Sequence, residues 1–216
     1  MPIEIKKHLD DNTILSLWRI TETVEELISQ LCLNHEELEF LNSFKNENRK
    51  KQWLSYRVLI RTLVEIDTIY KIYYDQQGKP YLINPSRNIT VTHSNIFSGI
   101  MVSPDLEKIM GMDIEQLKPT ILKIKHKFLN DTEQHALSYS PTEENYMTYW
   151  CAKEAIYKCF GVPSVSLKDN INIENFNGHS LIYATVEALG NKYKCELVKE
   201  CIENYIYCYT RQVCKI

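Results

Sequence analysis

The chain has 216 residues, of which 44% are hydrophobic and 25% charged, and its net charge at pH 7 is -3. This length allows one large core or two smaller lobes, and the composition is that of an ordinary globular protein. A slightly acidic chain has no overall basic field, which argues against a nucleic-acid-binding protein. Any polyanionic ligand must therefore be bound by local clusters of basic residues.

The cysteines and the N-terminal residues indicate a cytoplasmic protein. The seven cysteines contain no C-x-x-C pair and are odd in number, which suits reduced thiols better than a zinc site or a disulfide framework. No basic-then-apolar signal pattern opens the chain, and no run approaches the roughly 18 apolar residues of a membrane span. We expect a soluble protein that does not bind membranes.

Helices and strands are mixed in the first half of the chain. Residues 13–19 read as an edge strand, and residues 24–32 follow an acid-rich cap signal and read as a short helix. A long helix is expected at 45–64, with strands at 69–74 and 96–103. Both helices and strands are therefore expected in this half of the chain.

Basic side chains gather on one side of the helix expected at 45–64. Arg49, Arg57 and Arg61 lie on this side, whereas Trp53 is one of the apolar positions. Such a face is either solvated or binds an anion, and the pattern leaves both interpretations open.

Two short polar stretches follow this helix. The sequence G-K-P at 78–80, which contains Lys79, is typical of a hairpin turn. The stretch 88–94 ends with Thr92, His93 and a serine. A lone histidine is more often structural, but a histidine at a strand end among hydroxyl groups is well placed to bind phosphate.

Residues 109–115 predict a short strand with two carboxylates on one face. Asp113 and Glu115 are two positions apart, so in a strand they point the same way, with Met112 and Ile114 on the opposite face. Aligned carboxylates repel each other unless water or a cation lies between them. Carboxylate oxygens are ligands that Mg²⁺ prefers, so this strand is a candidate magnesium site.

Lysines line an amphipathic helix expected after this strand, at about 121–129. Its apolar positions face inwards and its basic positions remain for solvent. These basic positions are Lys118, Lys123, Lys125 and Lys127. They form either a solvated face or a docking face for an acidic partner.

A long helix is expected from Glu143 to Phe160. At about 3.6 residues per turn, Trp150, Glu154 and Lys158 share one face. The simpler interpretation is a solvated Glu-to-Lys pair worth about 0.3 kcal/mol. The alternative is that Glu154 is a third carboxylate beside the two on the preceding strand. Strands at 171–173, 180–188, 193–198 and 205–210 complete the chain.

Together these stretches resemble the 4′-phosphopantetheinyl transferase superfamily. G-M-D-I-E at 111–115 is similar to its G-I-D-I-E motif, and residues 150–158 are similar to its W-x-x-K-E-A-x-x-K motif. The stretches 78–80 and 88–94 match two further family elements, with Thr92 in place of a serine. The resemblance is to the two-lobed, surfactin-synthetase-activating type and extends over most of the chain.

The resemblance implies two pseudo-repeated α+β lobes, each a long helix packed on a small, mainly antiparallel sheet. The N-terminal lobe, 1–108, would bind the nucleotide side of coenzyme A, and the C-terminal lobe, 109–216, would hold the metal site and catalytic helix. The spacing of Trp53 and Arg57, which repeats at Trp150 and Glu154, agrees with such a repeat. Two lobes in one chain suggest a monomer.

The implied reaction transfers 4′-phosphopantetheine from coenzyme A to a serine of an apo carrier protein, with release of 3′,5′-ADP. Asp113, Glu115 and Glu154 would hold Mg²⁺, while Glu154 as general base and Lys158 as phosphate-binding cation would be the catalytic residues. The lysine face at 118–127 would dock the carrier protein.

Coenzyme A would be bound by basic and hydroxyl groups from both lobes. The resemblance implies contacts from Arg49, Arg57, Lys79, Thr92, His93, Lys153 and Lys158. Gln52 occupies the position of a phosphate-binding arginine in some relatives, so either Arg49 or Arg57 replaces it or the contact is absent. Two other interpretations remain: a catalytically silent module that binds coenzyme A or a nucleotide, and a Mg²⁺-dependent nuclease. The net charge disfavours the nuclease.

Overall fold

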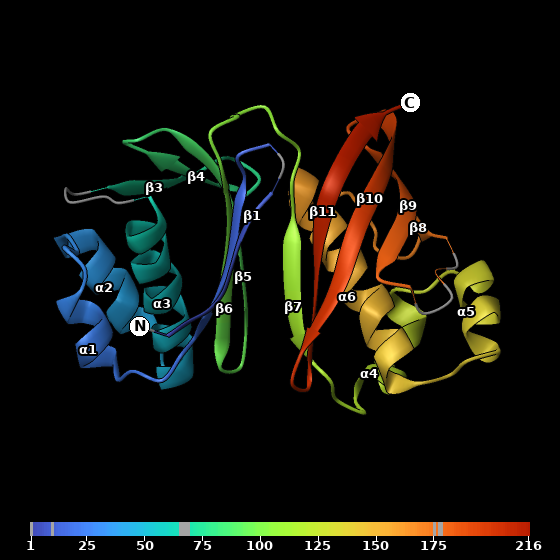
Figure 1. Cartoon of the computed structure of the whole chain (residues 1–216), viewed down its shortest axis with the longest axis horizontal. Coiled ribbons are helices and arrows are strands. Elements are labelled where there is room, and N and C mark those ends of the chain that lie inside the picture. Colours follow the sequence, from blue (N-terminus) through green and yellow to red (C-terminus); the bar gives the residue numbers. More distant parts are fainter. Residues whose placement is uncertain (1, 10, 65–69, 175, 177–178) are drawn as a thin grey trace. The chain divides into compact units, whose positions relative to one another are not determined.

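The computed structural model describes residues 2–9, 11–64, 70–174, 176 and 179–216 (Figure 1). The chain divides into two compact units. The first contains Met1–Tyr73 and Pro80–Leu106, and the second contains Tyr74–Lys79 and Glu107–Ile216. Most of the hairpin loop between the third and fourth strands is therefore grouped with the second unit.

The first unit is a six-stranded sheet with three helices. Its elements are β1 (Ile3–His8), β2 (Ile14–Arg19), α1 (Val24–Ser29), α2 (His35–Ser43), α3 (Glu47–Leu63), β3 (Lys71–Tyr74), β4 (Pro80–Ile83), β5 (Arg87–Ser94) and β6 (Phe97–Ser103). The strand order is β1-β2-β6-β5-β4-β3, and β2, β6 and β5 pair antiparallel. Helix α3 packs against β6, β2 and α1.

Local sequence fixes where the helices of this unit begin. Thr23 and Asn34 are N-caps of α1 and α2, and each belongs to a capping box closed by the glutamate three residues later. Helix α3 begins after Asn46, whose side chain accepts a hydrogen bond from the Arg49 backbone N–H. The buried side of α3, which includes Leu54 and Ile60, forms the core of this unit with the sheet.

The second unit is a five-stranded sheet covered by one long helix and flanked by shorter ones. Its elements are β7 (Met112–Gln116), α4 (Ile121–Ile124), the 3₁₀ turn η1 (Lys125–Lys127), α5 (Asp131–Ser138), α6 (Glu143–Phe160), β8 (Ile171–Ile173), β9 (Leu181–Ala188), β10 (Asn191–Ile202) and β11 (Tyr205–Lys215). The strand order is β7-β11-β10-β9-β8. Helix α6 packs mainly against β11 and β7.

Small side chains let α6 lie close to its sheet. Ala152 and Ala155 are fully buried in the core of this unit, beside Ile156 and Cys151. The helix begins after the cap residue Thr142 and ends at Gly161, which has a left-handed φ of 65°. A glycine adopts this conformation without steric cost, which is why the helix stops there.

The α+β fold class is confirmed, with a long helix and an antiparallel sheet in each unit. The prediction that residues 13–19 form an edge strand was wrong in position, because β1 pairs with β2 and takes the edge. The helix expected at 121–129 is also corrected: it is the four-residue helix α4 followed by the turn η1. Ile69, at the start of an expected strand, lies outside the described residues.

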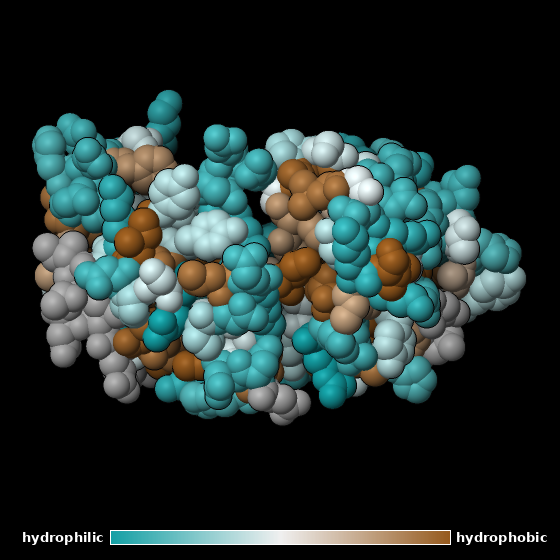
Figure 2. Space-filling view, turned by 90° about the horizontal axis from the view of Figure 1, so that it is seen from above, coloured by the Kyte–Doolittle hydropathy of each residue, from teal (hydrophilic) through white to brown (hydrophobic). Residues whose placement is uncertain are grey.

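The surface is mainly hydrophilic on the face shown in Figure 2, with hydrophobic patches between the hydrophilic side chains. Large exposed hydrophobic side chains include Phe40 of α2 and Leu189 of the turn between β9 and β10. No helix in the described parts of the chain is long and apolar enough to cross a membrane.

Candidate active site

Strand β7 and helix α6 bring the two motifs of the second unit together. Lys158 Nζ donates to Asp113 Oδ1 at 2.7 Å. Trp150 Nε1 donates to Glu115 Oε1 at 3.0 Å. Asp113 is only 5% exposed, whereas Glu115 is partly exposed. The carboxylates of β7 therefore face the side of α6 that carries Trp150, as alternation along a strand predicts.

Gly111 allows this strand to approach the helix. A Cβ atom at this position would lie 2.0 Å from the carbonyl oxygen of Ala155 and 2.9 Å from Cys159 Sγ. No side chain fits in that space without moving α6 away from β7. The Gly111 backbone N–H also donates to Thr210 Oγ1 at 2.9 Å, which ties the start of β7 to β11. The glycine of the G-M-D-I-E sequence thus has a packing reason.

Glu154 lies one helical turn from both Trp150 and Lys158 and is partly buried. Burial, together with the negative charges of Asp113 and Glu115, raises the pKa of its carboxyl group to about 7, against the opposing effect of Lys158. Glu154 therefore exchanges a proton near neutral pH. It also senses both carboxylates of β7, so the three acids form one electrostatic cluster.

The acid cluster fits a hard divalent cation in its chemistry. Carboxylate oxygens are the ligands that Mg²⁺ prefers, and the mutual repulsion that raises the pKa of Glu154 is relieved by a cation. Within the described ranges, however, no three His, Cys, Asp or Glu side chains are already spaced to hold a metal ion. The Lys158 ammonium group supplies the nearby positive charge at Asp113.

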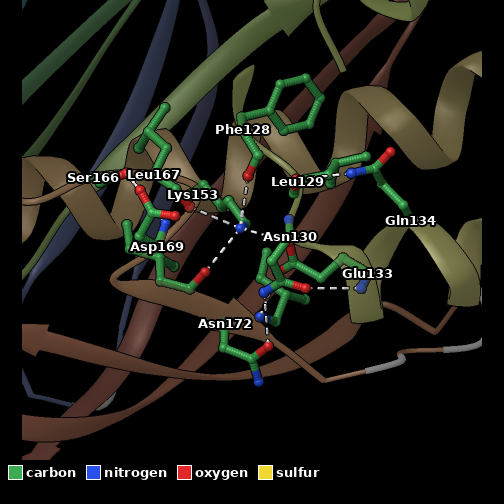
Figure 3. A network of polar contacts seen from close by, with 12 residues as sticks. Phe128, Leu129, Asn130, Glu133, Gln134, Lys153, Ser166, Leu167, Asp169 and Asn172 are labelled. Atoms are coloured by element: carbon green, nitrogen blue, oxygen red, sulfur yellow. Dashed lines mark hydrogen bonds and ion pairs between the residues drawn. The ribbon is translucent and has the colours of Figure 1, made fainter. Parts of the chain in front are cut away.

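Lys153 is buried away from this cluster. It is 0% exposed, and its ammonium group donates to Glu133 Oε2 at 2.7 Å and to three backbone carbonyl oxygens at 2.8 Å (Figure 3). These acceptors occupy all three protons of the ammonium group, so in this structure none of them is directed at the expected phosphate. The sequence analysis missed Glu133, although its place in a capping box with Asn130 marked it as ordered.

In the first unit, α3 brings Arg49 to His93 of β5. The Arg49 guanidinium contacts His93 Nε2 and lies 5.6 Å from the centre of the Phe44 ring. Thr92, the neighbour of His93, is 1% exposed. Gln52 Nε2 donates to the Asn95 carbonyl oxygen at 3.2 Å, so this side chain supports the turn between β5 and β6. Of the predicted coenzyme A residues in this unit, Arg49 and His93 are the pair in direct contact.

Arg57 belongs to the core of the first unit. It is 4% exposed, its guanidinium lies 3.4 Å from the centre of the Trp53 ring, and one of its nitrogens contacts the Tyr56 hydroxyl. The Arg57 guanidinium thus lies over an aromatic ring below the surface in this structure, and its contact with phosphate stays a prediction.

Lys79 lies at the C-terminal end of α6. Its Nζ donates to the Cys159 carbonyl oxygen at 3.2 Å, and burial lowers its pKa. A cation at this end of a helix compensates the unpaired carbonyl groups and the negative end of the helix dipole. Its assignment to coenzyme A stays a prediction.

The four lysines of the expected docking face surround α4 and η1. Lys118, Lys123 and Lys127 are exposed, and Lys125 Nζ lies 5.4 Å from the centre of the Tyr146 ring. Leu122 adds an apolar side chain that is 39% exposed.

Comparisons with known proteins agree with the resemblance in the motifs. Residues 109–210, which include β7 and α6, match the family model of the 4′-phosphopantetheinyl transferase superfamily. A curated relative, a 4′-phosphopantetheinyl transferase of Bacillus subtilis, is 30% identical over 133 residues, which is 55% of this chain and 58% of the relative. The alignment thus spans little more than half of that protein.

Among solved structures, part of this chain is similar to the holo-[acyl-carrier-protein] synthase of Thermotoga maritima. It is 16% identical, with a TM-score of 0.40, over 49% of this chain and 61% of that chain. The family match includes both motifs that meet in the second unit. Residues 109–210 of this chain are therefore similar to the 4′-phosphopantetheinyl transferase superfamily.

Proposed function

We propose that this protein transfers the 4′-phosphopantetheine group of coenzyme A to a serine of an apo carrier protein and releases 3′,5′-ADP. The observation that supports this most directly is the meeting of Asp113, Glu115, Glu154 and Lys158 between β7 and α6. An acid that exchanges its proton near pH 7, beside a lysine and two further carboxylates, suits proton transfer next to a phosphate group.

Glu154 acts as the general base in this proposal. In the metal-free protein its pKa is about 7, so a large fraction of the carboxyl group is ionised at neutral pH and available to accept the serine proton. Lys158 moves from Asp113 to the diphosphate when coenzyme A binds, because a diphosphate carries more negative charge than one carboxylate.

Asp113, Glu115 and Glu154 would hold Mg²⁺, in agreement with their oxygen ligands and their mutual repulsion. When bound, the ion supplies positive charge that offsets the charge of the diphosphate. Arg49 and His93 would bind the 3′-phosphate of coenzyme A, supported by their direct contact at the surface of the first unit. Thr92 and Lys79 remain secondary candidates for contacts with coenzyme A.

The lysines beside α4 would dock the carrier protein. Lys118, Lys123 and Lys127 are exposed next to the apolar side chain of Leu122, and this combination suits an acidic helix with an apolar stripe. Carrier proteins of this chemistry would include those of fatty-acid, polyketide and peptide synthesis.

The test is intact-mass spectrometry of an apo acyl carrier protein incubated with this protein, coenzyme A and Mg²⁺. Transfer of the arm adds about 340 Da to the carrier. Glu154→Gln should slow transfer by about 10²–10⁴-fold, the usual contribution of a general base. Glu143→Gln, on the first turn of the same helix, is the matched control and should retain the wild-type rate.

The competing interpretation is a catalytically silent module that binds coenzyme A. It predicts no mass gain with acyl or peptidyl carriers, while calorimetry still detects coenzyme A binding. That pair of results would reject the transferase and favour the silent module.

A further inference from the structure

Lys153 is the most completely enclosed charged side chain near the candidate site. Its ammonium group donates to the carbonyl oxygens of Phe128, Leu167 and Ile171 at 2.8 Å each. The fourth acceptor is Glu133 Oε2 at 2.7 Å. Figure 3 shows these acceptors converging on Nζ from separate segments of the chain. No proton of this ammonium group remains for a ligand.

Both oxygens of the Glu133 carboxylate also accept hydrogen bonds. Its Oε2 also accepts the backbone N–H of Asn130 at 2.9 Å, and its Oε1 accepts the backbone N–H of Ile173 at 2.8 Å. Glu133 is 1% exposed. The Lys153–Glu133 pair therefore joins α6 to the end of η1, the start of α5, the segment before β8, and β8 itself.

A buried ion pair of this kind is not explained by stability alone. Well-packed apolar side chains of similar volume often stabilise a core as much as or more than such a pair, because two charges must be taken out of water. The pair does restrict the rotation of α6 about its axis, because each of its hydrogen bonds requires one orientation of the helix. Burial lowers the pKa of Lys153 and Glu133 opposes this shift, so the partner favours the charged form that makes these contacts.

The orientation of Lys153 determines that of its neighbour Glu154. Adjacent residues of a helix point about 100° apart, so a helix held at Lys153 cannot rotate without moving Glu154. Lys158 follows one turn after Glu154 and is 2.7 Å from Asp113. A small rotation of α6 would separate these groups.

We propose that Lys153 is a positioning residue. Its buried pair with Glu133 fixes the rotation of α6 that turns Glu154 and Lys158 towards Asp113, and its ammonium group does not bind phosphate. The kinetic part of this proposal rests on the proposed transferase function.

The experiment compares Lys153→Met with two matched variants. Lys199→Met removes another buried lysine whose Nζ pairs with Glu144 of α6, at 2.5 Å from its Oε1. Lys158→Met removes the candidate phosphate-binding cation. Melting temperature, the Kd for coenzyme A, and kcat per folded molecule are measured for each variant below its melting temperature.

Lys153→Met should lower both the melting temperature and kcat, the latter by about 10²-fold, as small misplacements of reacting groups do. Its Kd for coenzyme A should change by less than about threefold, a small change in binding free energy. Lys199→Met should lower the melting temperature and retain kcat. Lys158→Met should retain the melting temperature and raise the Kd.

Two results would overturn the proposal. A raised Kd with an unchanged melting temperature, the pattern of Lys158→Met, would make Lys153 a phosphate ligand. A lowered melting temperature with an unchanged kcat, the pattern of Lys199→Met, would make it a structural residue only. If Lys153→Met does not fold, Glu133→Gln takes its place, because it keeps the shape of the partner and removes its charge.

Failure of the transferase function is recognised separately. A wild-type protein that modifies no carrier rejects the proposed function, and the indole N–H resonance of Trp150 then tests the geometry. This group donates to Glu115, so its chemical shift reports the orientation of α6. Lys153→Met or Glu133→Gln should shift this resonance and Lys199→Met should not, whereas an unchanged resonance in all three would reject the positioning role.

Discussion

Helices α3 and α6 carry similar sequence spacing and use it differently. Each has a tryptophan followed four residues later by a charged side chain. In α3 this side chain is Arg57, which lies flat on Trp53 and is 4% exposed. In α6 it is Glu154, which is partly exposed and interacts with the charge of Asp113.

The surroundings of the two side chains account for this difference. Arg57 lies over the Trp53 ring, and its Nε is 3.9 Å from Glu37 Oε1 of α2. Glu154 instead faces strand β7, which contains Asp113 and Glu115. The same helical spacing thus gives a cation packed on an aromatic ring in one unit and a cluster of acids in the other.

The largest effect should come from the close approach of β7 to α6 at Gly111. Gly111→Ala places a Cβ atom 2.0 Å from the Ala155 carbonyl oxygen, so β7 or α6 has to move. We expect a loss of about 3 kcal/mol in the free energy of unfolding, as for an overpacked core. Urea unfolding measures it. Gly190→Ala is the control, because nothing lies near its added Cβ and only its φ of 70° opposes the change. Equal losses in both variants would disprove the close-packing argument.

The next effect separates the two arginines of α3. Arg57→Met removes a cation from the face of Trp53 and should cost about 2 kcal/mol of stability, with little change in the Kd for coenzyme A. Arg49→Met should do the reverse and raise this Kd about tenfold, the value of one charge-assisted hydrogen bond. Thermal unfolding and calorimetry give both quantities. If Arg57→Met raised the Kd for coenzyme A and Arg49→Met lowered the stability instead, Arg57 would be the better candidate for binding coenzyme A.

In metal-free protein, Glu154 of α6 should make the free energy of unfolding depend on pH, and this distinguishes α6 from α3. The pKa of Glu154 is about 7 in the folded state and near 4.5, the ordinary value of a glutamate, when unfolded. The folded state binds more protons between these values, so the free energy of unfolding falls as the pH rises from about 4.5 to 7. Allowing for partial exposure, this loss is about 1–2 kcal/mol.

Glu154→Gln should remove that part of the pH dependence, whereas Glu143→Gln should retain it. Urea titrations at about pH 5 and about pH 8 in the presence of a chelator measure the difference. If Glu154→Gln and the wild type showed the same pH dependence of the free energy of unfolding, then burial and the charged neighbours would not destabilise the ionised form of Glu154.

The smallest effect concerns the exposed lysines of the second unit. Reversing the charge of Lys123 and Lys127 should raise the KM for the carrier about three- to tenfold and leave the KM for coenzyme A unchanged. The effect should shrink at high salt, because exposed charges are screened. The same reversal at Lys192 and Lys194 of β10 is the control. An unchanged KM for the carrier would remove this face as the docking site.

The sequence predicted which way side chains point where the residues on one face of a helix or strand differ in kind from those on the other. The alternation in β7 and the spacing of Trp150, Glu154 and Lys158 placed these residues on facing surfaces, and the structure brings them together. The same spacing could not predict the burial of Lys153. Helix α6 is buried on most sides, with Tyr146, Tyr149 and Cys159 all in contact with the core, so no apolar stripe marks its inner face.

The burial of Arg57 was unpredictable for a related reason. A row of basic residues on a helix reads as one solvated face, but Arg57 is turned inwards by stacking on Trp53, and Tyr70 donates to its backbone carbonyl oxygen at 2.6 Å.

The partner of Lys153 was also not predictable. Glu133 lies 20 residues from Lys153 in the sequence. A contact at that separation depends on how α5 folds back, which no local pattern encodes.

The position of Lys79 means that the second unit cannot be cut from the chain as one continuous fragment. A fragment beginning at Glu107 would contain every strand of its sheet but would lack Tyr74–Lys79, and with it the cation on the last turn of α6. The negative end of the helix that carries Glu154 would then lose its compensating charge. Tyr74–Lys79 is thus a structural part of the second unit, and a protein split at Glu107 would have to receive this segment as a separate peptide.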